Sequence, residues 1–197
     1  MRSWTSPSFW PMPRTSESQP LQIITRGTKT PHKKHKHMLV DFNELPDNSR
    51  IWIYQSNRNF TDAELQEVEE ALSAFLTEWT AHGSELHAAF ETRYKRFLVI
   101  GLNQAMAGAS GCSIDASVHF IQQLEKRYGV ELLDRMNVSF KQGEYITYKP
   151  LKDFKKMAKE KAVGPNTIVF NNLVATKGEY LEHWEVPAHE SWHSRFV

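Results

Sequence analysis

The sequence predicts an α+β fold: a ferredoxin-like split β-α-β two-layer sandwich with an additional C-terminal helix, strand and tail. Strand-like and helix-like segments follow one another in the order β-α-β-β-α-β-β. Both long helical segments carry one apolar face, and turn residues separate the short β-rich runs. The first six elements match the order in which this fold places two helices on one face of an antiparallel sheet.

The first elements are a strand over 51–56 and a strongly signalled helix. Thr61 and Glu64 have the spacing of a capping box, in which each side chain accepts a backbone N–H of the other residue. Apolar residues then recur at steps of three and four: Leu65, Val68, Leu72, Phe75 and Trp79. This spacing predicts a helix that ends near Gly83, a residue suited to a C-terminal cap.

The following segments predict two hairpins, two helices and a last strand. Residues 86–102 are rich in strand formers around a charged middle and indicate a hairpin. A second helix follows, with an apolar face made by Val118, Ile121, Leu124 and Tyr128. A second hairpin pairs 137–140 with 145–148, and a third helix begins near Pro150. Residues 164–166 end that helix, and 167–170 form the last strand.

Residues 1–37 differ from the rest of the chain. They hold five of the nine prolines and carry a net charge of +6, with no sustained periodicity. Such a segment does not bury a core, and we expect a disordered basic extension. Our interpretation is that Met38 is the biological start, and the alternative is a genuine disordered tail. Residues 38–197 are then expected to form a single α+β domain.

Charge and composition favour a soluble cytoplasmic protein. No apolar run approaches the roughly 18–20 residues that cross a bilayer, so we expect no membrane span. The single cysteine excludes an internal disulfide, which suits a reducing compartment. Residues 38–197 carry a net charge of −5, which makes nucleic acid an unlikely partner. The lysine-rich segment 149–161 is interpreted as the solvated face of an amphipathic helix.

The most informative candidate site is the small-residue loop 107–115, between a predicted strand and a predicted helix. Backbone N–H groups at such a helix start, together with the helix dipole, favour a bound anion or a thiolate. Two amides at the end of the last strand and one histidine add hydrogen-bonding groups. The candidate ligand-binding residues are Gly108, Ser110, Gly111, Cys112, Ser113, Asp115, His82, Asn171 and Asn172.

Cys112 leaves an enzyme open as the alternative. A thiol enzyme needs a base, and His119 is a candidate because it lies four residues after Asp115 on one helix face. The simpler interpretation is a small buried thiol that fills a turn. The Cys-x₅-Arg phosphatase pattern is absent because position 118 is Val. A catalytic pair of Cys112 and His119 is therefore the second hypothesis.

The segment His189-Glu190-Ser191-Trp192-His193 matches the zinc-protease pattern His-Glu-x-x-His. That chemistry needs a helix that places both imidazoles on one face, and Pro187 is poorly placed for its start. We expect a tail that docks through its aromatic residues, and we expect no metal and no cofactor.

Five blocks together resemble one protein family. They are 51–56 (Ile-Trp-Ile-Tyr-Gln-Ser), 79–83 (Trp-Thr-Ala-His-Gly), 109–115 (Ala-Ser-Gly-Cys-Ser-Ile-Asp), 169–174 (Val-Phe-Asn-Asn-Leu-Val) and 191–193 (Ser-Trp-His). From Met38 to Val197 the chain is similar to bacterial proteins of about 160 residues, without an established function, that often carry the label "ABC transporter ATPase".

The residues do not support that label as an activity. An ABC ATPase requires Gly-x₄-Gly-Lys-Ser/Thr to hold phosphates and Mg²⁺, and the closest glycine pair here, Gly108 and Gly111, has the wrong spacing. The preferred hypothesis is a non-catalytic ligand-binding or accessory protein. Its expected partner is a small polar or anionic ligand or another protein, with a polar or anion site at loop 107–115.

Overall fold

The computed structural model describes residues 38–81, 87–103 and 111–197. The predictions for residues 1–37, His82, Gly108 and Ser110 lie outside these ranges. The elements, in chain order, are β1 Met38–Leu39, η1 Phe42–Glu44, β2 Arg50–Gln55, α1 Asp62–Ala81, β3 His87–Arg93, β4 Phe97–Leu102, α2 Gly111–Tyr128, β5 Asn137–Gln142, β6 Tyr145–Pro150, α3 Leu151–Lys159, β7 Ile168–Phe170, α4 Lys177–His183, β8 Glu185–Pro187, η2 Ala188–Glu190 and η3 Trp192–Arg195.

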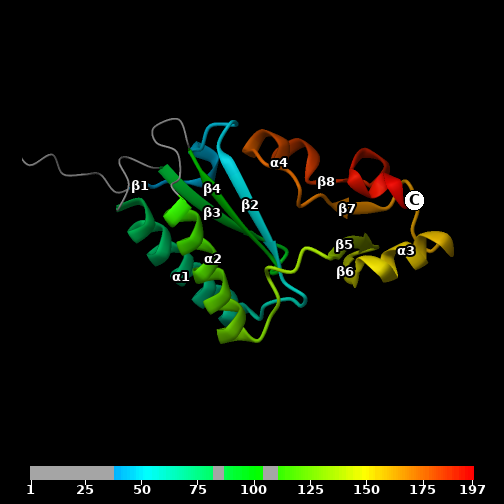
Figure 1. The fold of residues 1–197 in the computed structure, drawn as a ribbon, viewed down its shortest axis with the longest axis horizontal. Coiled ribbons are helices and arrows are strands. Elements are labelled where there is room, and N and C mark those ends of the chain that lie inside the picture. The colour runs from blue at the N-terminus through cyan, green and yellow to red at the C-terminus, as the bar shows by residue number, and fades with distance from the viewer. Residues whose placement is uncertain (1–37, 82–86, 104–110) are drawn as a thin grey trace, which may run out of the picture. The chain divides into compact units, whose positions relative to one another are not determined.

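The first sheet has the strand order β1-β3-β4-β2 and carries helices α1 and α2 on one face (Figure 1). Strand β1 is parallel to β3, and the other pairs are antiparallel. Strand β4 is buried along its whole length. Leu98, Ile100 and Leu102 pack with the helices, whereas Phe97 and Val99 belong to a second core on the other face. This central strand is a continuous apolar run because both of its faces are covered.

The opposite face of the first sheet is covered by the C-terminal part of the chain. Phe170 at the end of β7 and Tyr180 and Trp184 around α4 join Phe97 in one buried cluster. The rings of Phe97 and Phe170 are 4.7 Å apart, and those of Phe97 and Trp184 are 5.0 Å apart. Aromatic packing therefore connects the first sheet to the C-terminal elements.

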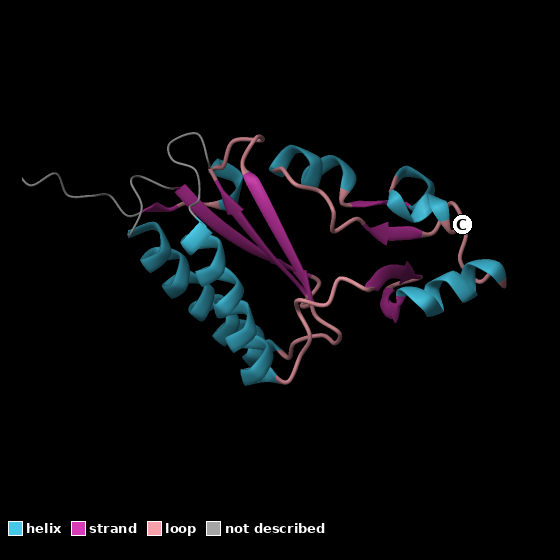
Figure 2. Ribbon diagram, viewed as in Figure 1, coloured by secondary structure: helices cyan, strands magenta, loops and turns pink. Residues whose placement is uncertain are grey.

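The second sheet is antiparallel, with the order β6-β5-β7-β8 (Figure 2). Its core contains Val138 and Phe140 of β5, Phe154 of α3 and Val169 of β7. Helix α3 begins directly after Pro150, as its sequence indicates. The C-terminal tail, for which the sequence predicts no helix or strand, contains helix α4 and strand β8, and Val186 of β8 completes the sheet beside Val169.

The α+β class is confirmed, but the ferredoxin-like topology is not. The order β2-β4-β3, with α1 and α2 on one face, agrees with three strands and two helices of that fold. The fold also requires the next strand to pair with β2, and β5 instead pairs with β6 and β7. Strand β5 buries Val138, Ser139 and Phe140 in succession, so it needs cover on both faces. Phe154 of α3 and Ala188 of the C-terminal tail cover the face that carries Val138 and Phe140.

Local signals at the first helix and the two hairpins are confirmed. Glu64 N–H donates to Thr61 Oγ1 at 3.2 Å, and Thr61 N–H donates to Glu64 Oε2 at 2.9 Å, which completes the capping box. Arg58 donates two further bonds to Glu64, and these bonds with that from Thr61 lower the pKa of Glu64 to about 2. Gly143 has φ 59° in the turn between β5 and β6.

Replacing Thr61 with Ala is expected to lower the free energy of unfolding by about 1 kcal/mol, because two N–H groups of the first turn depend on this capping box. Denaturant unfolding measures the change. The matched control is Thr77→Ala, in the C-terminal part of the same helix, where Oγ1 donates to Ser73 C=O at 2.8 Å and caps no helix N-terminus. Equal effects at the two positions would contradict the capping role.

Candidate functional site

The loop selected from the sequence is described only from Gly111 onward, where α2 begins. Cys112 and Ser113 therefore lie in the first turn of that helix. Asp115 and His119 follow on α2 and are exposed. The anion site and the Cys112–His119 pair remain predictions.

Asn171 and Asn172, the two amides at the end of β7, make hydrogen bonds within the protein. Asn172 Nδ2 donates to Gln55 Oε1 at 2.9 Å, and Asn172 Oδ1 accepts the indole N–H of Trp184 at 2.9 Å. Gln55 Nε2 in turn donates to the carbonyl of Asn137 at 3.0 Å. Asn171 Oδ1 accepts the N–H of Leu173. The amides thus join the ends of β2, β5 and β7.

The two histidines of the zinc-protease pattern do not share a helix. His189 lies in η2 and is exposed, and its Nδ1 lies 2.8 Å from the carbonyl of Pro165. His193 lies in η3 and is fully buried, with Nδ1 2.8 Å from Ser191 Oγ. Within residues 38–81, 87–103 and 111–197, no group of three His, Cys, Asp or Glu side chains is placed to hold a metal ion.

A cavity of about 270 Å³ lies along the outer edge of β2. Figure 1 shows β2 as the strand of the first sheet that lies nearest to β5 and β7. The lining residues come from four places in the chain. They are 50–55 of β2, 132–135 before β5 with 137 at its start, 170 at the end of β7 with 172–175 after it, and Trp192. The cavity is therefore formed where three distant parts of the chain meet the edge of the first sheet.

The exposed edge of β2 can be read from its hydrogen bonds. Ser56 N–H donates to Arg96 C=O. The backbone N–H and C=O groups of the even-numbered residues of β2 therefore point toward β4. Ile51 N–H donates in the other direction, to Ala175 C=O at 2.9 Å. Because successive residues of a strand alternate, the N–H and C=O of Ile53 also point away from β4. Among the described residues, no hydrogen bond reaches these two groups of Ile53.

Two buried donors contribute to the same cavity. The side-chain Nδ2 of Asn137 and the indole Nε1 of Trp192 are buried, and neither has a hydrogen-bond partner among the described residues. Buried polar groups are almost always hydrogen-bonded, and an unsatisfied one costs about 1–3 kcal/mol. Both groups are donors, and both atoms are closed off from solvent, so a ligand with hydrogen-bond acceptors reaches them only when the side chains around them move aside.

The charges around the cavity are predominantly positive. Arg50 and Arg135 contribute two guanidinium groups, and Asp134 contributes the one carboxylate of the lining. Asp134 also accepts the N–H of Met136 at 2.7 Å. Arg50 is placed over the ring of Trp52, 4.7 Å from its centroid. Burial raises the pKa of Tyr54, so this phenol stays neutral and acts as a hydrogen-bonding group.

Sequence reasoning missed most of this site. Of the predicted ligand-binding residues whose side chains the structure describes, Asn172 lines the cavity and Asp115 and Asn171 do not. Arg50 and Asn137 lie in no motif, and no motif assigns a ligand-binding role to Ile53 or Trp192, because their chemistry depends on which atoms stay unpaired after folding. One signal was available, because three of the five blocks that carry the family resemblance, 51–56, 169–174 and 191–193, contribute lining residues.

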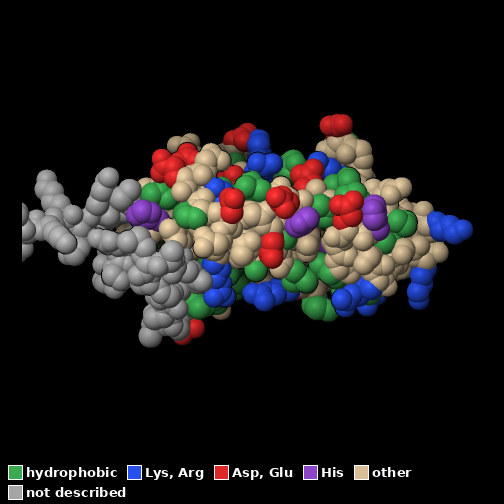
Figure 3. Space-filling view, turned by 90° about the horizontal axis from the view of Figure 1, so that it is seen from above, with side chains coloured by type: hydrophobic (Ala, Val, Ile, Leu, Met, Phe, Trp, Pro, Cys, Tyr) green, Lys and Arg blue, Asp and Glu red, His purple; other side chains and the backbone are tan. Residues whose placement is uncertain are grey.

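Comparison with known proteins adds no assignment: no family model, curated protein or solved structure matches the chain. In the described ranges no helix combines the length and apolarity needed to span a membrane. Acidic, basic and hydrophobic side chains all appear on the face shown in Figure 3, and none of them covers it as a single patch.

Proposed function

We propose that the protein is a non-catalytic ligand-binding or accessory protein that holds a small, acceptor-rich molecule in the cavity beside β2. The observation that carries this proposal is the pair of buried, unpartnered donors, Asn137 Nδ2 and Trp192 Nε1, in one cavity lining. A carboxylate or carbonyl oxygen would supply the acceptor that each donor lacks, once the side chains around it move aside. Arg50 and Arg135 favour a ligand with negative charge.

The composition of the lining supports binding rather than catalysis. Among the residues that the structure describes, the lining contains no Cys, Ser, Thr or His, so these residues offer no thiol or aliphatic hydroxyl beside an imidazole base. Its one carboxylate, Asp134, is exposed and bonds to the backbone. A cavity of this kind, mainly apolar with a few placed donors, is typical of small-molecule sites.

The family resemblance and a bacterial, cytoplasmic location belong to the same proposal. The resemblance is supported by five blocks in the same order, and the location by the single cysteine. The partner is then a small polar or anionic ligand or a protein that presents such a group. ATP hydrolysis is not part of the proposal because the phosphate-binding motif is absent from the sequence.

Nuclear magnetic resonance tests the proposal on the full chain with two probes, acetate and N-acetylglycine. We expect at least one probe to shift the indole N–H of Trp192 and the side-chain amide of Asn137 in a saturable way. Trp192→Phe, which removes the indole donor and keeps an aromatic ring, should weaken that binding about tenfold, as Asn137 signals report.

The matched control is Trp79→Phe, which makes the same change in the helix-side core at a residue that is not part of the cavity lining. This variant should bind the probe as the unchanged protein does. The proposal fails if neither probe moves the two signals at concentrations of tens of millimolar. It also fails if both tryptophan variants weaken binding equally.

A further inference from the structure

We infer that the ligand of this cavity is a short, extended peptide-like molecule with a free carboxylate, and that its amide pairs with Ile53 at the edge of β2. The inference rests on the proposed function and names the class of its ligand. It is carried by the juxtaposition of an unpaired strand edge, two buried donors and two arginines in one cavity.

The edge of β2 already accepts an antiparallel segment of this chain next to the cavity. Ile51 N–H donates to Ala175 C=O at 2.9 Å, and Lys177 N–H donates to Ser49 C=O at 2.9 Å. Arg50 and Thr176 form the bridge between these two bonds. The pairing shows that β2 has the geometry for strand addition on this side.

The paired segment leaves the edge before it reaches Ile53. Val174 N–H turns back to Asn171 C=O at 3.3 Å, so residues before Ala175 do not continue the ladder. The next outward-facing residue of β2 is Ile53, which presents one donor and one acceptor. An antiparallel backbone amide satisfies both groups at once, because a hydrogen-bonded pair exchanges two N–H···O bonds.

The cavity limits the length of this ligand. At the far end, the Gln55 side chain is bonded to the Asn137 carbonyl and to Asn172, which closes the edge. The stretch from Ile51 to Gln55 spans roughly 13 Å at 3.3 Å per residue. A short stretch of free edge around Ile53 within a volume of about 270 Å³ suits a ligand of about two residues.

The groups around the edge determine which end of a peptide would fit. Asn137 Nδ2 and Trp192 Nε1 are donors only, and a carboxylate accepts from several donors at once. Arg50 and Arg135 add positive charge to the same lining. A C-terminal carboxylate therefore suits this lining, whereas an ammonium group would meet donors and cations.

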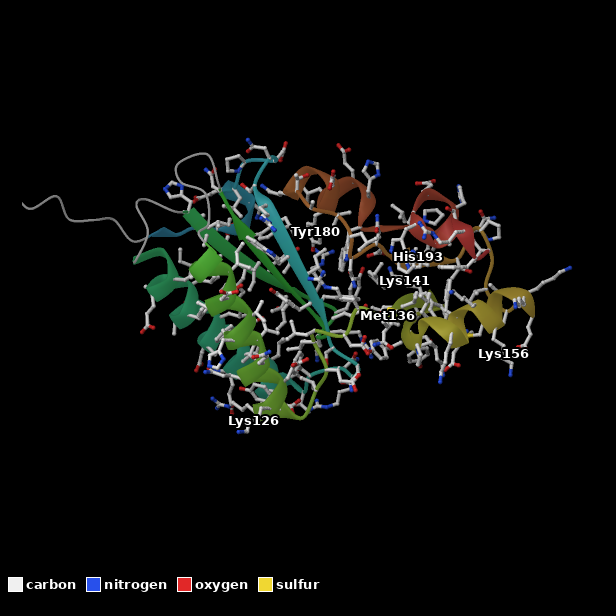
Figure 4. All side chains as sticks on the ribbon, in the orientation of Figure 1. Lys126, Met136, Lys141, Lys156, Tyr180 and His193 are labelled. Carbon is white, nitrogen blue, oxygen red and sulfur yellow. The ribbon has the colours of Figure 1, made fainter. Side chains whose placement is uncertain are left out.

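The rim adds apolar contacts for the ligand's side chains. Leu173 is 66% exposed and lines the cavity, and Met136, between two lining residues, is 65% exposed. Figure 4 labels Met136 on the segment that leads into β5. Large exposed apolar side chains beside a polar cavity favour a ligand with an aliphatic side chain.

The decisive experiment compares three matched probes on the unchanged protein: N-acetylvaline, N-acetyl-N-methylvaline and N-acetylvalinamide. The second lacks the amide N–H, and the third lacks the carboxylate. We expect N-acetylvaline to shift the Ile53 amide, Asn137 and Trp192 signals together. Each of the other two probes should bind about tenfold more weakly, which corresponds to the loss of one good hydrogen bond.

A backbone variant gives an independent test. Ile53→Pro removes the outward N–H and no ladder bond to β4, and it should weaken N-acetylvaline binding about tenfold, whereas Ile53→Val should not. If the Pro variant does not fold, the three probes still decide the question on the unchanged protein. Equal binding of all three probes would overturn the peptide inference and leave the proposed function standing. Binding of acetate without binding of N-acetylvaline would also overturn the peptide inference and leave the proposed function standing. If no probe shifts any of these signals, both the peptide inference and the proposed function are wrong.

Discussion

Replacing Phe97 with Ala is expected to lower the free energy of unfolding by about 3–5 kcal/mol, the range for a fully buried aromatic residue. Phe97 has no exposed surface, and its ring contacts the rings of Phe170 and Trp184. These contacts join the first sheet to the chain segments that line the cavity. Denaturant unfolding should therefore show a large loss, and the Asn137 and Trp192 resonances should move as well.

The control for this variant is Tyr145→Ala on β6, where the ring is 80% exposed. A surface change of this kind is expected to alter the free energy of unfolding by no more than about 0.5 kcal/mol. A loss below about 1 kcal/mol for Phe97→Ala would mean that the aromatic cluster does not hold the two parts together.

The free energy of unfolding should fall by about 3 kcal/mol between pH 6.5 and pH 4 because of His193 alone. Burial lowers the pKa of this imidazole from 6.5 to about 4. The unfolded chain then takes up a proton at His193 as the pH falls below 6.5, whereas the folded protein does not. The folded state is thus fully stable above pH 6.5 and loses this contribution as the pH falls to 4.

Thermal unfolding across this pH range tests the assignment with His193→Gln, which does not titrate. The variant should show a flatter dependence of stability on pH than the unchanged protein. His183→Gln is the control, because it makes the same change at an exposed position. Identical slopes for the unchanged protein and for His193→Gln would refute the role of His193.

Local elements were predictable because their signals lie within a few residues of each other. Thr61 and Glu64 bond to each other across one turn, and the apolar steps from Leu65 to Trp79 face one core. The hairpin turn at Gly143 follows from its freedom to adopt positive φ. Such features depend on short-range sterics and hydrogen bonds, so they can be read from the sequence before any tertiary contact is known.

The candidate site was predictable only in part. Asn172 was selected as a hydrogen-bonding residue and does line the cavity, yet both ends of its amide bond to Gln55 and Trp184. The donors that stay unpaired belong to Asn137 and Trp192. Which polar atom stays unpaired depends on contacts between residues far apart in the chain, and periodicity carries no information about those contacts.

By itself, the amino-acid sequence determined the α+β class, the first helix and its cap, the two hairpins and the absence of a nucleotide-phosphate motif. Only the tertiary structure decided that β5 joins a second sheet, that β2 keeps a free edge at Ile53, and that His193 is buried. The physical reason is that each strand edge can pair with any other extended segment. The choice between partners is made by burial of side chains such as Val138 and Phe140 against distant residues, and that energy is not local.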